Sequence, residues 1–179
     1  MSRLIAERFP ATLELALVAA LLALVIGVPM GVYAALKRGT FTSQLFMTLS
    51  LLGVSLPTFL IGILLILVFA VHLGWFPSFG RGEVVQLGWW STGLLKAKGW
   101  HHITLPAITL AIFQLTLIMR LVRAEMLEVL RTDYIKFARA RGLSNRAIHF
   151  GHALKNTLVP VLTITGLQLG GLIAFAIIT

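Results

Sequence analysis

The chain alternates between long apolar runs and shorter polar connections. A helix needs about 20 apolar residues to cross the hydrocarbon layer of a bilayer. Four stretches without Asp, Glu, Lys or Arg come close to this length or exceed it, at 15–36, 39–71, 103–119 and 156–179. The third is the shortest, but apolar positions continue beyond it. The pattern therefore predicts an all-α, polytopic helical membrane protein with about four spans, at approximately 11–36, 44–72, 103–128 and 156–179.

The composition agrees with a membrane protein and narrows the chemistry. Hydrophobic residues make up 58% of the chain and charged residues 12%, whereas soluble domains have about 25% charged residues. The absence of cysteine excludes disulfides and thiolate metal sites. His101 and His102 are adjacent, with no carboxylate or thiolate near them in the sequence, so we expect no metal site. No combination of side chains indicates a catalytic site, and we expect no enzyme.

Positive charge is distributed unevenly between the connections. Eight Lys and Arg residues lie within 120–155, but only three lie within 73–102. The positive-inside rule therefore predicts a cytoplasmic loop at 129–155 and an outer loop at 73–102. This topology accounts for the net charge of +9, and we expect no nucleic-acid partner. The same parity places the N-terminus outside, so we expect a further span upstream and a fragment of a longer protein.

The outer loop contains four tryptophans, Trp75, Trp89, Trp90 and Trp100. Tryptophan at the end of a span typically anchors the chain at the membrane interface. The alternative is that this loop meets an external carrier of the substrate.

Within the spans, small residues predict sites of close helix packing. Gly27-x-x-x-Gly31 and Gly166-x-x-x-Gly170 follow the spacing that lets two helices approach closely. Pro29 and Pro57 interrupt apolar runs and predict kinks in a packed bundle. No Asp, Glu, Lys or Arg lies deep within a span, which argues against an ion-coupled secondary transporter.

The cytoplasmic segment predicts two helices joined by an elbow. The first runs from Arg120 to Arg141 with a stripe of Leu127, Leu130, Tyr134, Phe137 and Ala138. Gly142 caps its C-terminus. Ser144 then caps a short helix that begins at Asn145, with an apolar face of Ala147, Gly151, Leu154 and Leu158.

Two interpretations of this basic hairpin remain open. Lys and Arg beside a span fix topology and bind anionic lipid, which would make the protein a membrane-anchored scaffold with a lipid-binding basic loop. Topology requires charge alone, however, whereas this segment also has a capped two-helix shape. That shape favours a docking surface for a cytoplasmic partner.

The sequence "DYIKFARARGLSNRAIHFGHALKNTLVPVLT" at 133–163 closely resembles the cytoplasmic loop of bacterial ABC importer permeases of the dipeptide, oligopeptide and nickel branch. "FPATLELAL", "GVPMGVYAALKRG", "SLPTFLIGILLILVFAVHLGWFP" and "LPAITLA" extend the resemblance over essentially the whole chain. The family's EAA signature aligns Lys136, Phe137 and Ala138 with Glu-Ala-Ala, and Gly142 with the following glycine. Only Ala138 and Gly142 match, and Lys155 occupies the position of a later proline.

The resemblance implies a six-span subunit, of which 1–179 would be one partial transmembrane permease domain in the bacterial inner membrane. In this family the loop is a coupling helix that docks on a cytoplasmic ATPase. The resemblance assigns that role to Ala138, Gly142, Leu143, Ser144, Asn145, Arg146, Ala147 and Ile148.

The chain has no Gly-x-x-x-x-Gly-Lys-Ser/Thr motif for ATP phosphates. ATP would therefore be bound by the partner, and we expect no cofactor in this chain. The implied partners are cytoplasmic ATP-binding subunits, a second and homologous permease subunit, an external solute-binding protein and the lipid bilayer. The implied solute is a peptide, with nickel or glutathione as alternatives.

Overall fold

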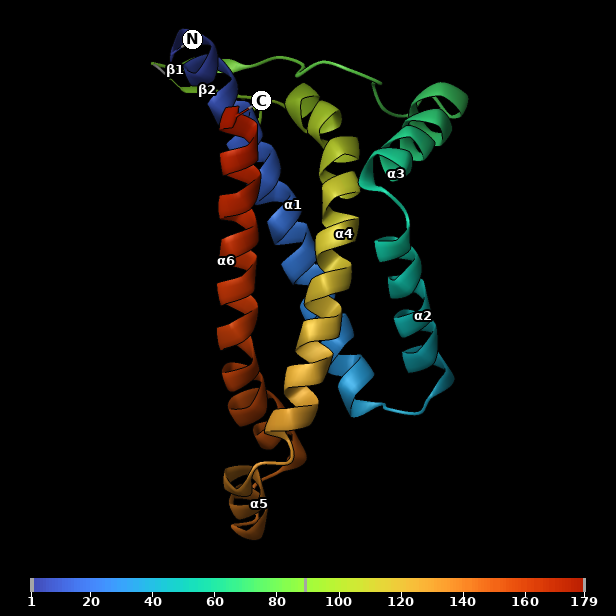
Figure 1. The fold of residues 1–179 in the computed structure, drawn as a ribbon, viewed down its shortest axis with the longest axis vertical. Coiled ribbons are helices and arrows are strands. Elements are labelled where there is room, and N and C mark those ends of the chain that lie inside the picture. The colour runs from blue at the N-terminus through green and yellow to red at the C-terminus, as the bar shows by residue number, and fades with distance from the viewer. Residues whose placement is uncertain (1, 89, 179) are drawn as a thin grey trace.

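Three long helices form the body of the protein and run side by side (Figure 1). The structure is a computed structural model that describes residues 2–88 and 90–178, with side chains described for 9–86, 88 and 90–171. The long helices are α1 (Ser2–Leu36), α4 (Ala97–Val129) and α6 (Leu154–Ile178). The contact between α1 and α4 is the most extensive, and α6 packs against both. Trp89 of the predicted interface anchors lies outside the described residues.

The remaining elements lie beside this body or at its two ends. Between α1 and α4 come α2 (Phe41–Ser55), α3 (Thr58–Leu65), the π-helix η1 (Ile66–His72) and the strands β1 (Val85–Leu87) and β2 (Trp90–Thr92). Between α4 and α6 come α5 (Asp133–Ala140) and the π-helix η2 (Ala147–Ala153). The two-stranded hairpin lies at one end and α5 at the opposite end (Figure 1). The predicted outer and cytoplasmic loops therefore occupy opposite ends of the bundle.

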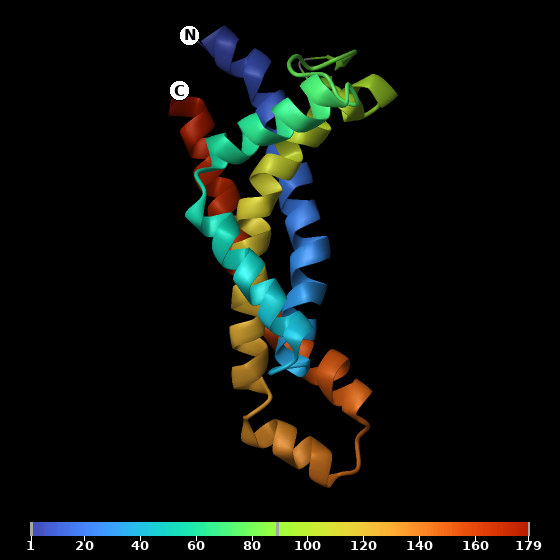
Figure 2. The ribbon, with the colours of Figure 1, turned by 90° about the vertical axis from the view of Figure 1, so that its right-hand side faces the viewer.

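Among the described residues, two helices are long and apolar enough to cross a membrane, Phe9–Leu36 and Ala97–Val129. A third crossing is possible by length and composition if α2 and the α3–η1 helix together form one broken span. The structure divides the predicted span 44–72 at Pro57, where the two parts meet at an angle of 101° (Figure 2). The last residues of the predicted fourth span, from 172 onward, have no described side chains.

Close contact between α1 and α4 depends on small residues of α1. A Cβ added at Gly31 would lie 2.7 Å from both the carbonyl oxygen of Met119 and Cβ of Val122. A Cβ at Gly27 would lie 3.2 Å from the carbonyl oxygen of Leu115. The predicted packing pair Gly27 and Gly31 therefore lies where the two helix backbones approach most closely. The alanines of α1 at 16, 19, 20, 23 and 34 are likewise buried.

The second predicted packing motif has a different environment. A Cβ at Gly166 or Gly170 would meet no described atom within 4 Å. The same helix exposes Val159, Leu162 and Leu167, by 65%, 56% and 71%. This face of α6 has no neighbour among the described residues, so a packing role for Gly166 and Gly170 stays a prediction.

The prediction of one continuous helix from Arg120 to Arg141 was wrong. Helix α4 ends at Val129, and the hydroxyl of Thr132 donates a 2.6 Å hydrogen bond to the carbonyl oxygen of Val129. Thr132 has an extended backbone, and α5 begins at Asp133. This turn resets the helical phase, so the predicted stripe does not form a single face.

The residues of that stripe are separated by the turn. In α5, Ile135 and Ala138 point inward, whereas Tyr134 and Phe137 are 40% and 63% exposed. Apolar spacing therefore identified Ala138 correctly but placed Tyr134 and Phe137 wrongly on the buried face, because the spacing was counted across a break in the helix.

Candidate functional site

The C-terminus of α5 ends in a tight reversal at Gly142. Its φ is +78°, a left-handed conformation that glycine adopts without steric cost. The amide of Leu143 donates to the carbonyl oxygen of Ala138 at 3.3 Å, and the amide of Gly142 donates to that of Arg139 at 2.9 Å. This pair of bonds is a Schellman motif. The glycine cap expected from the sequence is confirmed.

Ser144 begins the next helix. Its side-chain oxygen accepts a 3.3 Å hydrogen bond from the amide of Ala147, and its carbonyl oxygen accepts a 3.0 Å bond from the amide of Ile148. The helix starts at Asn145, as predicted, and continues into η2. Only Leu143 and Ser144 separate the Gly142 cap from the next helix, so the two caps form a short and well-defined elbow.

The elbow is fixed to the bundle by buried side chains, of which only Ala138 was expected on an apolar face. Ile135, Ile148 and Ala153 have no exposed surface, and Ala138 is 6% exposed. They belong to the same buried cluster as residues of all three long helices, including Ala35, Met126 and Val161. The elbow is thus in direct packing contact with α1, α4 and α6.

The predicted face of the second helix was wrong in part, since Leu158 is partly buried and Leu154 packs against the buried cluster, but its other members do not form the buried face. Ala147 and Leu154 are only partly buried and Gly151 is exposed, whereas Ile148 and Ala153 are fully buried. The π-helical hydrogen bonds of η2 reach one residue further than α-helical bonds. A face counted at α-helical spacing therefore drifts away from the bundle.

The eight residues proposed for ATPase coupling divide into three groups by exposure. Ala138 and Ile148 are buried inside this chain, and Ala147 is partly buried. The continuous segment Gly142–Arg146 is exposed. Only the exposed segment is free to meet a partner, while the buried pair supports it from behind.

Apolar side chains are exposed around the elbow. Phe137, Leu143 and Phe150 are 63%, 40% and 51% exposed. The guanidinium of Arg141 lies 5.7 Å from the centroid of the Phe137 ring, in cation–π contact. A surface that combines exposed aromatic residues with arginines is typical of a protein interface.

His149 lies near the arginines of the elbow, among them Arg139. Burial lowers the pKa of its imidazole, and the positive charge of Arg139 lowers it further. The ring is therefore largely uncharged at neutral pH, and the positive charge of the elbow comes from arginine and lysine.

A hydrogen-bonded clip joins α5 to the start of α6. Nδ2 of Asn156 donates to the phenolic oxygen of Tyr134 at 2.7 Å, and that hydroxyl donates to the carbonyl oxygen of His152 at 3.4 Å. Tyr134 was predicted to lie on an apolar stripe, and the role of its hydroxyl was missed. The two residues are 22 positions apart, so no local pattern could reveal the contact.

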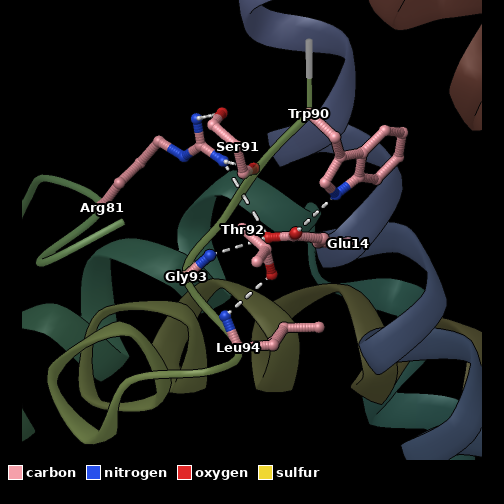
Figure 3. A network of polar contacts seen from close by, with 7 residues as sticks. All are labelled: Glu14, Arg81, Trp90, Ser91, Thr92, Gly93 and Leu94. Carbon is pink, nitrogen blue, oxygen red and sulfur yellow. Dashed lines mark hydrogen bonds and ion pairs between the residues drawn. The ribbon is translucent and has the colours of Figure 1, made fainter. Parts of the chain in front are cut away.

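At the outer end, a buried carboxylate holds the hairpin against α1 (Figure 3). Glu14 is 6% exposed and accepts hydrogen bonds from Trp90 Nε1 at 3.3 Å and from the amide of Gly93 at 3.4 Å. The guanidinium of Arg81 lies 3.9 Å from the same carboxylate and donates to the carbonyl oxygen of Ser91. The sequence signal was present, because Glu14 is the single acidic residue within the predicted span 11–36.

Comparison with known proteins identifies the family. The family described as "Binding-protein-dependent transport system inner membrane component" matches residues 27–179. The chain belongs to this family. It is therefore a multi-pass protein of the bacterial inner membrane, in agreement with its apolar helices.

Three relatives have names that describe their transport systems. The chain is 45% identical to the di/tripeptide transport system permease DppB of Pseudomonas aeruginosa, with 96% of this chain and 54% of the relative covered. It is 39% identical to the dipeptide transport system permease DppB of Alkalihalophilus pseudofirmus, with 94% and 54% covered. It is 38% identical to that of Escherichia coli K12, with 96% and 55% covered. The chain spans about half the length of these relatives.

In this member of the family, the positions aligned with the EAA signature differ in burial and in backbone conformation. Lys136 forms an exposed ion pair with Asp133 at 2.8 Å, and Phe137 is exposed. Ala138 and Gly142, the two that match the signature, are the buried contact and the left-handed cap. The matching residues are thus those that determine the shape of the elbow.

Proposed function

We propose that this chain is part of the transmembrane permease of an ATP-driven ABC importer for short peptides, and forms half of the translocation pathway. The observation that carries the proposal is the capped elbow, which exposes Gly142–Arg146 while Ile148 fastens it to the long helices. The names of the relatives support a peptide as the solute. They favour peptides over nickel chelates and glutathione.

The proposed mechanism divides the work between subunits. Since the chain has no phosphate-binding loop of its own, cytoplasmic ATP-binding subunits would bind and hydrolyse ATP, and this chain would have neither an ATPase site nor a cofactor. An external solute-binding protein would deliver the peptide at the outer end. A second, homologous permease subunit would complete the pathway.

The elbow would transmit the motion of the ATPase to the membrane. Closure of the nucleotide-bound ATPase pair would displace the exposed segment Gly142–Arg146. Packed interiors resist deformation, so the buried side chains behind the elbow would carry this displacement into α1, α4 and α6. Conformational change in this form is a rigid-body movement of packed helices.

The test is transport by the full-length permease, reconstituted with its cognate subunits and external binding protein in lipid vesicles. We expect uptake of a labelled dipeptide that requires ATP, and co-purification of the ATPase with the permease. Uptake of a nickel chelate or glutathione, with no uptake of dipeptide, would overturn the choice of solute.

The alternative scaffold makes a different prediction in the same preparation. A lipid-binding basic loop would retain the protein on anionic vesicles but would recruit no ATPase and drive no uptake. That result would replace the importer proposal with the scaffold.

A further inference from the structure

A cavity lies beside the break between α2 and α3. Its volume is about 670 Å³, and its walls come from the break, from α4 and from α6. Gln114 of α4 lines it and lies near the midpoint of that helix. At 1.5 Å per residue, Gln114 is more than about 20 Å from either end of α4. The cavity therefore lies about midway along α4, a helix long and apolar enough to cross a membrane.

Gln114 is a buried polar residue with an unused hydrogen-bonding atom. The residue is 4% exposed, and its Oε1 has no hydrogen-bond partner among the residues that the structure describes. An unpaired amide oxygen is unfavourable in the apolar interior of a membrane protein. Oε1 itself is shielded in this conformation, and rotation of the terminal amide about its last torsion, which breaks no hydrogen bond of this atom, would bring it to the cavity. After this rotation Gln114 would offer an acceptor to a ligand.

The break supplies the complementary group, a donor. Pro57 has no amide hydrogen, and the amides of Leu60 and Ile61 both donate to its carbonyl oxygen. The first amides of α3, those of Thr58 and Phe59, therefore have no acceptor within the helix. Thr58 lines the cavity. The start of a helix favours negative charge, and a carboxylate is a natural ligand there.

The rest of the wall constrains the ligand further. Leu110 and Phe113 provide apolar surface, and Gln168 of α6 provides a second amide. Among the described residues that line this cavity there is no Asp, Glu, Lys or Arg. Such a wall would contact peptide side chains of different kinds without selecting for charge. The polar groups would bind the carboxylate and amide groups that all peptides share.

We propose that this cavity is a binding site for short peptides within the translocation pathway. The peptide carboxylate binds the first amides of α3, and an N–H group of the peptide donates to Oε1 of Gln114. A cavity of this volume lies within the range of small-molecule sites, about 300–1,000 Å³. The assignment rests on the proposed function, because it takes a peptide as the transported solute.

The first test uses the full-length permease in its reconstituted complex. Gln114→Leu removes the acceptor and keeps a similar size. We expect uptake of a labelled dipeptide at low concentration to fall about fivefold, the effect of one lost hydrogen bond. The matched control is Thr116→Val on the same helix, because Thr116 donates to the carbonyl oxygen of Ile112 and does not line the cavity. We expect uptake by this variant to stay at the wild-type rate.

The second test detects occupancy directly and keeps Gln114 intact. Thr58→Cys introduces a thiol into the cavity wall, within a stretch of 179 residues that contains no cysteine. Saturating dipeptide should slow its alkylation by N-ethylmaleimide several-fold, and a dipeptide amide, which lacks the carboxylate, should not. The control is Leu45→Cys, exposed on α2 and outside this cavity. Its alkylation should not respond to peptide.

The outcomes separate this proposal from the proposed function. If wild-type vesicles take up dipeptide but peptide does not protect the thiol of Thr58→Cys, the site is wrong and the importer stands. Unchanged uptake by an assembled Gln114→Leu complex would lead to the same conclusion. If wild-type vesicles take up another solute and no dipeptide, the peptide is not the transported solute, and the proposed peptide site is rejected with it. Should Gln114→Leu not assemble, protection of the introduced thiol decides.

Discussion

The phenolic oxygen of Tyr134 accepts a 2.7 Å hydrogen bond from Nδ2 of Asn156 and thereby joins α5 to the first turn of α6. The two residues come from opposite arms of the cytoplasmic elbow. Their bond links the two helices that flank the elbow, so a force on the exposed segment 142–146 would reach α6 partly through this bond.

Tyr134→Phe removes this bond and the longer bond from the hydroxyl to the carbonyl oxygen of His152, and keeps the ring. We expect the ATPase still to bind, because the exposed segment is unchanged, but less peptide to be transported for each ATP hydrolysed. Loss of the shorter bond alone predicts about a two- to tenfold decrease. The measurement is uptake and ATP hydrolysis in the same vesicles. Thr163→Val is the control, since its hydroxyl bonds only to Val159 of its own helix. Equal coupling in both variants would exclude a role for the clip.

Glu14 should hold the outer hairpin in place. In Glu14→Gln, the new amide group would present hydrogens to donors that now face the carboxylate, those of Gly93 and Arg81. We expect protease added from outside to cleave within 73–96 at least several-fold faster. Glu83→Gln is the matched control, because it breaks only the exposed pair with Lys98, and exposed ion pairs contribute little. If cleavage is equal in the two variants, Glu14 does not anchor the hairpin.

Position 142 requires glycine because its backbone is left-handed, and not because a side chain would lack space there. No described atom lies within 4 Å of a Cβ added there, but its φ is +78°. The left-handed conformation costs a residue with a Cβ about 1–2 kcal/mol, so Gly142→Ala should lower stability by that amount and Gly142→Val by more. Thermal unfolding of the purified full-length protein measures this effect.

Gly151 offers the control for that experiment. It is equally open but has no positive φ, and it lies within the helix η2, where alanine is favoured over glycine. Gly151→Ala should leave the melting temperature unchanged or raise it. A decrease equal to that of Gly142→Ala would show that the elbow does not need a left-handed residue.

The sequence predicted those features that depend on short-range physics. Apolar runs predicted the positions of the long helices. The count of Lys and Arg in the two longest connections predicted that these connections lie at opposite ends of the bundle. Gly142 and Ser144 predicted the elbow because both caps are determined by residues within one turn. The start of the second helix at Asn145 followed for the same reason.

Features that depend on distant residues were missed. The break after Val129 shifted the buried face to Ile135, and the π-helical turn shifted it again to Ile148 and Ala153. Neither position carries a proline, and the one local signal at the first, Thr132-Asp133, which are residue types that commonly begin a helix, was not used. The partners of Glu14 and Asn156 are 76 and 22 positions away. Such contacts appear only when the helices are assembled.

Gly31 should tolerate no side chain. An added Cβ would lie 2.7 Å from a backbone oxygen of α4, so Gly31→Ala must separate two helix backbones. Overpacking of this kind costs about 1–3 kcal/mol. Gly27→Ala meets its neighbours at 3.2 Å and should cost less, and Gly166→Ala, which meets nothing described, should cost least. Thermal unfolding of the three full-length variants tests this order. A reversed order would contradict the α1–α4 contact.

The exposed elbow should act through its shape and not through its summed charge. Leu143 is 40% exposed between the two caps, where a partner would cover it, and Leu143→Asp would bury a charge in that contact. We expect this variant to lose ATPase binding and peptide-stimulated hydrolysis almost completely. Charge removal by Arg139→Gln or Lys155→Gln should reduce them at most slightly.

Lipid binding predicts the opposite order for these variants. Each Lys or Arg near an anionic surface contributes about 1 kcal/mol, so Arg139→Gln and Lys155→Gln would then be the damaging changes and Leu143→Asp a mild one. The measurements are pull-down of the ATPase and peptide-stimulated hydrolysis in vesicles of increasing anionic lipid content. Damage that follows the lost positive charge and the lipid composition would favour the membrane-surface interpretation over coupling. Damage confined to Leu143→Asp, at every lipid composition, requires a protein partner at the elbow.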